Sequence, residues 1–234
     1  MAYFELKPSE AANGAAKNPR LDYSRFGAAI PREIIEFGYI PDLGQMKPGD
    51  IVLVRPETPP AKPTQPIKHF KSILSGDASY YIQTAQKKIE RSPNYLWVHA
   101  ALYLGRDLVV EAVAPKVAVN TFSSYAAKRC VRIRRMPNIS RAKAYDACIE
   151  AVRRIGDSYD TEAIKNLSIH FLTEKKIAPD LIKAAYICSE LIQHAFLYGA
   201  SAVIVNVGNI RTPTPADLSA SPYLRDVPLQ WRPI

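Results

Sequence analysis

The alternation of apolar and polar residues in the middle of the chain predicts a β-hairpin. Residues 97–104 and 108–114 are rich in aliphatic and aromatic side chains, and residues 105–107 between them are typical of a turn. A three-residue loop places His99 and Glu111 on one face of the hairpin as diagonal neighbours, within reach of a long side chain. The inference depends on the loop length, because a shift of one residue would send Glu111 to the opposite face.

The other patterns predict an α+β domain around this hairpin. A fully apolar run at 51–55 follows a turn and predicts a strand, and helical spacing predicts a helix over 140–155. Thr214 and Asp217 form a capping box with Pro215 at the first helical position, which starts a short helix. Weaker patterns predict strands at 117–120, 130–135 and 203–207, short helices at 31–37 and 122–128, and basic helical segments at 67–74 and 77–90.

The strand predicted at 130–135 has a strongly basic character. It carries Arg132, Arg134 and Arg135. Charged side chains commonly protect an edge strand against pairing with another chain. We therefore interpret these arginines as a protected sheet edge rather than as a phosphate-binding site.

Two helical segments carry a cysteine on their apolar side. Around Cys188, the residues at helical spacing are apolar, so the sulfur lies on the stripe that packs inward. A thiol there is either an inert buried residue or a nucleophile in a cleft, and His99 is the distant partner that the second interpretation needs. The stripe of the helix at 140–155 consists of Ala144, Ala147, Cys148, Ala151, Val152 and Ile155.

Composition narrows the class of protein. The 234 residues suit one domain with an extension, and 47% hydrophobic with 23% charged residues is typical of a soluble globular protein. The net charge of +9 favours anionic surfaces such as nucleic acid, lipid headgroups or cell-wall polymers, or it is a solvated face. The three cysteines lack the spacing of a metal or redox motif, so we expect reduced thiols, no metal and no cofactor.

The ends and interruptions of the chain suggest its organisation. The N-terminus has no basic start followed by an apolar core, and no run of eighteen apolar residues occurs, so we expect neither a signal peptide nor a transmembrane segment. This predicts residence in the cytoplasm of the producer, or delivery to a target cell envelope by a system that uses no signal peptide. Residues 1–46 are interpreted as an N-terminal extension, and 47–234 as the domain, with an insertion at about 56–95.

Short motifs that occur in order along residues 47–222 suggest a family. They are Gly49-Asp50-Ile51-Val52, Trp97-Val98-His99-Ala100-Ala101-Leu102-Tyr103-Leu104-Gly105, Val110-Glu111-Ala112, Tyr159-Asp160, Cys188-Ser189-Glu190-Leu191-Ile192 and Thr214-Pro215-Ala216-Asp217-Leu218 with Ser221-Pro222. Together they resemble the circularly permuted NlpC-like branch of papain-like cysteine hydrolases, which includes lecithin:retinol acyltransferase-like and YiiX-like proteins. In that branch the histidine strand precedes the cysteine helix, as His99 precedes Cys188 here.

The resemblance implies a fold, a site and a reaction. The fold is a central antiparallel sheet with the helix of the nucleophile packed on it. Cys188 would be the nucleophile, His99 its general base and Glu111 the group that orients the imidazole. The reaction would be amide hydrolysis through an acyl-enzyme, by an amidase or endopeptidase acting on peptides, most naturally the peptides of peptidoglycan. Aromatic candidates for the substrate cleft are Tyr186, Tyr159 and Trp97.

Other functions remain open at this stage. One is a thiol acyltransferase or lipid esterase of the lecithin:retinol acyltransferase-like type. Another is a basic binding module without catalysis. A basic domain without a signal peptide would also suit a secreted antibacterial effector toxin, with a cognate immunity protein as its partner and no expected role for nucleic acid.

The residues before Cys188 give two conflicting signals. Helical periodicity alone makes residues 179–198 one continuous helix with Cys188 in its middle. The family pattern instead starts the helix near the cysteine, and we follow it, with a predicted break between Lys183 and Ile187. Glu190 would then complement the helix N-terminus, and His194 would project on another side of the helix as a structural or solvated residue.

Overall fold

The computed structural model describes most of the predicted domain. It covers residues 38–56, 82–83, 86–87, 93–126, 129–160, 162–163, 185–208 and 212–233. The helix predicted at 31–37, most of the N-terminal extension and most of the insertion at 56–95 lie outside the described residues. The prediction for 67–74 therefore stays a prediction, and of the segment 77–90 only residues 82–83 and 86–87 are described, which are helical as predicted.

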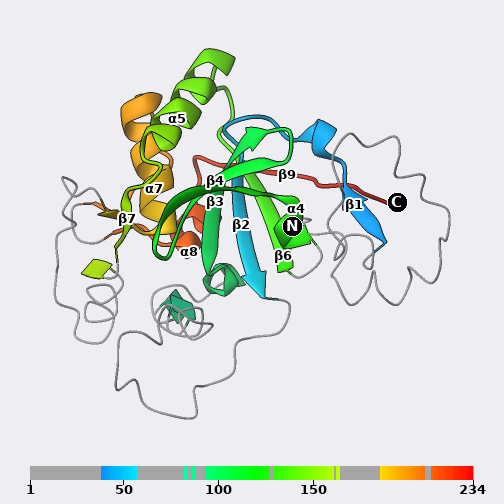
Figure 1. Cartoon of the computed structure of the whole chain (residues 1–234), viewed down its shortest axis with the longest axis horizontal. Coiled ribbons are helices and arrows are strands. Elements are labelled where there is room, and N and C mark those ends of the chain that lie inside the picture. The colour runs from blue at the N-terminus through cyan, green and yellow to red at the C-terminus, as the bar shows by residue number, and fades with distance from the viewer. Residues whose placement is uncertain are drawn as a thin grey trace, which may run out of the picture.

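A curved antiparallel sheet forms the centre of the described fold (Figure 1). Its strand order is β8-β7-β5-β4-β3-β2-β6-β9, and only β7 and β8 run parallel. A separate two-stranded sheet pairs β1 (Tyr39–Pro41) with β10 (Trp231–Pro233). The strands of the large sheet are β2 (Ile51–Pro56), β3 (His99–Gly105), β4 (Leu108–Val113), β5 (Lys116–Thr121), β6 (Arg129–Arg135), β7 (Ser158–Tyr159), β8 (Ala185–Tyr186) and β9 (Arg225–Val227).

Helices cover one face of this sheet (Figure 1). The main ones are α5 (Arg141–Arg153) and α7 (Cys188–His194), and α7 continues directly into a π-helical turn, η5 (Ala195–Gly199). Among the shorter elements, α8 (Pro215–Ala220) packs on the same face, whereas α4 (Ser123–Ala126) and the 3₁₀ turn η2 (Leu43–Gln45) pack on the other face; η4 (Pro93–Leu96) is a further 3₁₀ turn. The predicted α+β class is confirmed by this arrangement.

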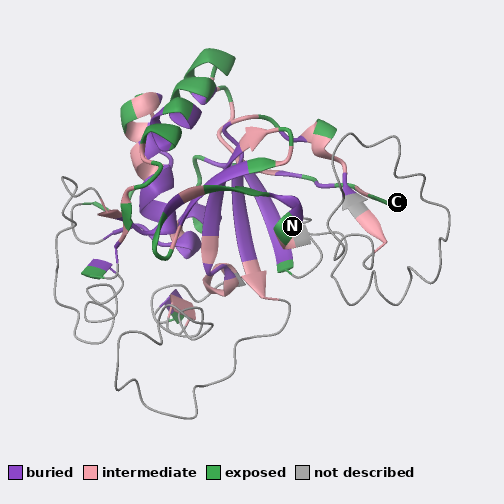
Figure 2. Ribbon diagram, in the orientation of Figure 1, coloured by how far each residue is buried: buried purple, intermediate pink, exposed green. Residues whose placement is uncertain are grey.

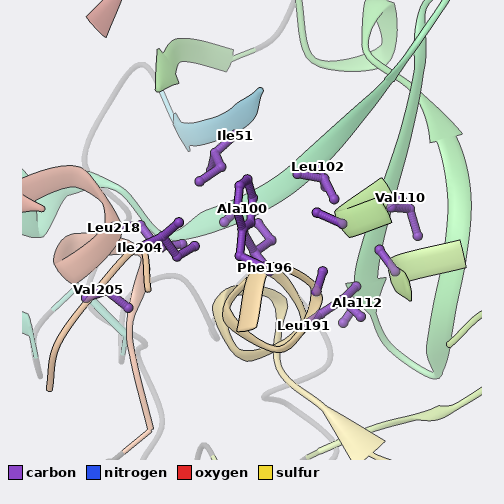
Figure 3. Close-up of a cluster of buried hydrophobic side chains, with 14 of the residues drawn as sticks. Ile51, Ala100, Leu102, Val110, Ala112, Leu191, Phe196, Ile204, Val205 and Leu218 are labelled. Carbon is purple, nitrogen blue, oxygen red and sulfur yellow. The ribbon is translucent and has the colours of Figure 1, made fainter. Parts of the chain in front are cut away.

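Strand alternation builds a core on each face of the sheet. Ile51 and Leu53 point into the helix-facing core, whereas Val52 and Val54 belong to the core on the other face. Figure 3 shows Leu191 and Phe196 of the α7–η5 segment packed against the first core. This packing fixes the position of α7 on β3 and β4, the two strands of the predicted hairpin.

The pairing of β3 with β4 has the register that the sequence predicted. Leu102 lies opposite Val110 and Tyr103 opposite Val109. The loop differs from the prediction, because Gly105 pairs with Leu108 and only two residues, Arg106 and Asp107, form the turn. Their φ angles of 51° and 68° are those of a tight hairpin turn, and a register shift between Tyr103 and Gly105 absorbs the difference.

Helix α5 begins as predicted, with the side chain of Ser140 accepting a hydrogen bond from the N–H of Lys143. Its predicted apolar stripe is only partly correct. The small residues and Cys148 are buried, but Val152 and Ile155 are 41% and 45% exposed. The helix packs by its narrow small-residue side on η5, so these larger side chains lie outside the contact.

Two further predictions have opposite outcomes. Thr214 caps α8 through the predicted reciprocal bonds with Asp217. The strand predicted at 203–207 is wrong, because these residues form no strand. Ile204 and Val205 are apolar because they fill the core from an irregular segment. A short apolar run signals burial, and it does not by itself distinguish a strand from a buried loop.

Gly199 makes the contact between η5 and α5 possible. A Cβ at this position would lie 2.5 Å from the backbone oxygen of Asp146 and 2.9 Å from the Cα of Ala147. We expect Gly199→Ala to lower the free energy of unfolding by about 2–3 kcal/mol, because two backbones must separate. Urea unfolding measures the loss. Gly44→Ala is the comparison for the glycine change itself, because Gly44 is exposed and the nearest atom to its added Cβ, at 3.1 Å, belongs to the side chain of Asp42.

Candidate active site

Cys188 is the first residue of α7. Ile187 before it is extended, with φ −87° and ψ 164°, and Tyr186 pairs with β7. The predicted helix start near the cysteine is therefore correct, and the continuous helix favoured by periodicity is wrong at this point. The carboxylate of Glu190 accepts a hydrogen bond from the N–H of Ile187 at 3.5 Å, as expected of a residue that complements a helix N-terminus.

His99 and Glu111 meet on the face predicted from the hairpin register. The Nε2 atom of His99 is in direct hydrogen-bond contact with Oε2 of Glu111. Glu111 is 4% exposed, whereas the imidazole is only partly buried. A buried carboxylate so placed fixes the orientation of the ring and favours its charged form.

The thiol of Cys188 is a second partner of the His99 ring. Because Nε2 contacts Glu111, the other ring nitrogen, Nδ1, is the atom available to the sulfur. Burial alone would lower the pKa of His99, but the charge and hydrogen bond of Cys188, together with Glu111, raise it to about 10. The arrangement therefore places an imidazole that can hold a proton beside the sulfur, as a thiol nucleophile requires.

Two residues that the sequence interpretation missed complete the surroundings of Glu111. Asn120 on β5 donates from Nδ2 to Oε1 at 2.6 Å, and the hydroxyl of Tyr125 on α4 donates to Oε2. Burial would raise the pKa of Glu111, but these bonds and the one from His99 lower it below its usual value. Glu111 is thus held as a carboxylate with both oxygens engaged.

Their sequence signals were weak for different reasons. Asn120 lies opposite Val109, and so diagonal to Glu111, once the register of β4 with β5 is known. Tyr125 belongs to a separate short helix, and its ring centroid lies 6.1 Å from that of His99. No local pattern in the sequence links that helix to the hairpin.

The aromatic residues proposed for the cleft have different surroundings. Tyr159 is partly buried, and its pKa is raised by burial and by the charge of Cys188, which places it near the sulfur. Tyr186 is buried and packs against His194, with ring centroids 5.1 Å apart. Trp97 is 2% exposed within the helix-facing core. The cleft interpretation is therefore kept for Tyr159 and corrected for Tyr186 and Trp97, whose rings are core packing.

His194 has the structural role expected of it. It contacts Glu150 through Nε2 at 3.2 Å and lies between the rings of Tyr186 and Tyr198. Burial lowers its pKa despite this carboxylate. It is therefore a neutral packing residue on the side of the α7–η5 segment that faces Glu150 of α5.

Comparison with known proteins identifies a similar fold. No protein-family model matches the chain, and no curated protein matches it. The crystal structure of YiiX from Escherichia coli O157:H7, a metalloprotein with the domain DUF1105, is similar with a TM-score of 0.52 at 14% identity. The similarity covers 80% of this chain and 99% of YiiX, and it shows that the two share a fold.

The name of YiiX implies a bound metal in that protein, whereas the described residues of this chain offer no cluster of ligands for one. Among them, no group of three His, Cys, Asp or Glu side chains could hold a metal ion. His99 and Glu111 point at each other rather than at a common centre. Within the same described part, no helix is long and apolar enough to cross a membrane.

Proposed function

We propose that the protein is a thiol hydrolase of the circularly permuted papain-like type, which cleaves an amide bond through an acyl-enzyme. The observation that carries this proposal is the continuous series of contacts from the thiol of Cys188 through the His99 ring to the Glu111 carboxylate. Such a series combines a nucleophile, a base and an orienting group. The order of the residues along the chain and the likeness of fold to YiiX support the permuted topology.

In the first half of the reaction, the proton of the Cys188 thiol resides on Nδ1 of His99. The thiolate attacks the carbonyl carbon of the substrate and forms a C–S bond, while the carbonyl electrons move onto oxygen. The N–H of Cys188, in the first turn of α7, has no partner within the helix and can donate to this oxyanion. The imidazolium then gives its proton to the leaving amine as the C–N bond breaks.

The second half regenerates the thiol. His99, now neutral, takes a proton from a water molecule, whose oxygen attacks the thioester carbon. The C–S bond breaks, the product leaves as a carboxylic acid, and the proton returns to the Cys188–His99 pair. Glu111 stabilises the imidazolium in both halves and keeps its Nε2–H away from solvent.

The pH dependence tests the role of Glu111. The imidazolium is the proton donor, so we expect kcat/KM to fall as the pH rises through the raised pKa of His99, about 10. Glu111→Gln removes a charge that raises this pKa, so the alkaline limb moves to lower pH by roughly 1 unit or more. A pH profile of both forms measures the shift, and an unmoved limb would contradict the role of Glu111.

The proposed substrate class is the peptide part of bacterial cell wall. The support for it is the family resemblance of the motifs around His99 and Cys188, which is an analogy. The test is mass spectrometry of purified sacculi after incubation with the wild type and with Cys188→Ala. New peptide ends with the wild type alone would support the proposal. Lipid products from vesicles, with none from sacculi, would overturn this substrate class in favour of lipid acyl chemistry.

A further inference from the structure

A cavity of about 460 Å³ lies at the end of the sheet opposite to the candidate site. It opens between the turn before β2, the end of β6 and the start of α5. His99 pairs with Val54 at the far end of β2, whereas Asp50 lines the cavity. Four residues of extended strand separate those ends by about 13 Å, so the cavity is distinct from the Cys188 site.

The charge of this cavity is strongly positive. Arg135 binds Asp50 with two hydrogen bonds of 2.6 Å, so this pair is internally neutral. Three further cationic side chains, all exposed, belong to the lining: Lys47, Arg141 and Arg225. The cavity is therefore complementary to an anionic group such as a phosphodiester.

An exposed apolar ridge runs from the cavity along α5. Arg141 and Tyr145 line the cavity, and the guanidinium lies 5.5 Å from the centre of the tyrosine ring. Ile149 and Val152 follow at helical spacing on the same side of α5 and are 49% and 41% exposed. Figure 2 shows this outer surface of α5 as exposed. Basic groups, an aromatic ring and aliphatic side chains thus form one continuous surface.

We propose that this surface docks on an anionic phospholipid bilayer. A lipid phosphate enters the basic cavity, and Tyr145, Ile149 and Val152 enter the boundary between headgroups and acyl chains. Basic residues near an anionic membrane and an apolar helix side in its interface are the two contributions that hold peripheral proteins on bilayers. A soluble anion would neutralise the positive charge of the cavity, but its binding would not explain why an exposed apolar ridge lies beside the cavity.

The geometry has a consequence for the other end of the molecule. Because the cavity and the His99 end of β2 lie at opposite ends of the strand, docking turns the Cys188 site away from the bilayer. The surface is independent of the proposed hydrolase function. Cys188→Ala is therefore expected to bind vesicles like the wild type, so a failure of either proposal can be recognised separately.

Flotation of the whole chain with vesicles tests the docking surface. We expect binding to vesicles of phosphatidylcholine with an equal part of phosphatidylglycerol, and little binding to phosphatidylcholine alone. Arg141→Gln and Arg225→Gln should each weaken binding to the anionic vesicles roughly fivefold, because each removes one positive charge. The double change Ile149→Ser with Val152→Ser should weaken it on the order of tenfold.

Matched controls come from β5, which lies away from this surface. Lys116→Gln removes an exposed charge and Val119→Ser an exposed aliphatic side chain, and both should bind like the wild type. Equal melting temperatures exclude unfolding. Arg225 lies on β9, whereas Arg141, Ile149 and Val152 all lie on α5, so Arg225→Gln alone remains informative if the changes in α5 unfold the helix.

Three results would overturn the docking proposal. The first is no flotation with anionic vesicles. The second is loss of binding in the β5 controls to the same extent as in the surface variants, since binding would then reflect overall charge. The third is a protein that binds glycerol phosphate in calorimetry but does not bind vesicles. In that case the affinity for glycerol phosphate would be the same in the wild type and in the variant with Ile149→Ser and Val152→Ser.

Discussion

Cys188→Ala is expected to lower kcat/KM for amide hydrolysis by on the order of 10⁴-fold to 10⁶-fold, because the acyl-enzyme of the proposed reaction forms on its sulfur. The side chain is small and 4% exposed, so the loss of one sulfur should change the fold little. The measurement is the rate of product formation from the substrate found with sacculi, together with the melting temperature of both forms. Activity of the variant at the wild-type rate would contradict the nucleophile assignment.

Cys148→Ala is the matched control for this change. Cys148 is also a buried helical cysteine, but its sulfur faces the backbone oxygen of Tyr103 at 3.6 Å. Burial raises its pKa to about 12, which keeps it a neutral and unreactive thiol. The control variant should therefore retain kcat/KM, and any loss it shows should appear in stability alone.

Asp226→Ala is expected to have the largest effect on stability, about 3–5 kcal/mol of the free energy of unfolding. The carboxylate binds the guanidinium of Arg132 through both oxygens at 2.7 and 3.0 Å, and it also accepts from Arg134 at 3.0 Å. Arg132 and Arg134 are 3% and 7% exposed, so the change leaves two buried cations without this countercharge. Urea unfolding measures the loss, and a loss below about 1 kcal/mol would contradict this account.

Asp226→Asn separates charge from shape at the same position. Burial would raise the pKa of Asp226, but bonds from the two arginines lower it below its ordinary value of 3.8. Its contribution is therefore present above the unfolded pKa and is lost as the pH falls through the folded one. As the pH falls, the free energy of unfolding should decrease more for the wild type than for Asp226→Asn. If the two proteins gave parallel curves of this free energy against pH, the charge of Asp226 would be unimportant for stability.

The positions of His99 and Glu111, unlike that of Cys188, followed from local signals in the sequence. The hairpin pattern sets the face shared by the first two, even though the turn has two residues and a register shift instead of three residues. The start of α7 required the family pattern, because periodicity cannot detect that Tyr186 pairs with β7. Local patterns succeed where the partners lie on one hairpin.

The remaining features depend on contacts between distant segments. The arginines of β6 were interpreted as a protected sheet edge, and this is wrong because β9 pairs with β6 and covers it. Arg132 and Arg134 instead bind the last turn of α8 and the segment before β9, through oxygens of Ser219 and Leu224. Val152 was expected to pack inward, but the side of a helix that meets its neighbour depends on the partner and not on the helix alone.

The charge of His99 at neutral pH tests the central claim most directly. Nitrogen-detected NMR follows the charge of the imidazole without any substrate. The signal of His99 is identified as the one that is missing in His99→Gln. The account predicts an imidazolium at pH 8 that titrates near the raised pKa of about 10, with a lower midpoint in Cys188→Ala because the sulfur contributes to the shift. A midpoint near 6.5 that is the same in Cys188→Ala would contradict the interaction of Cys188 with His99 and the hydrolase proposed from it.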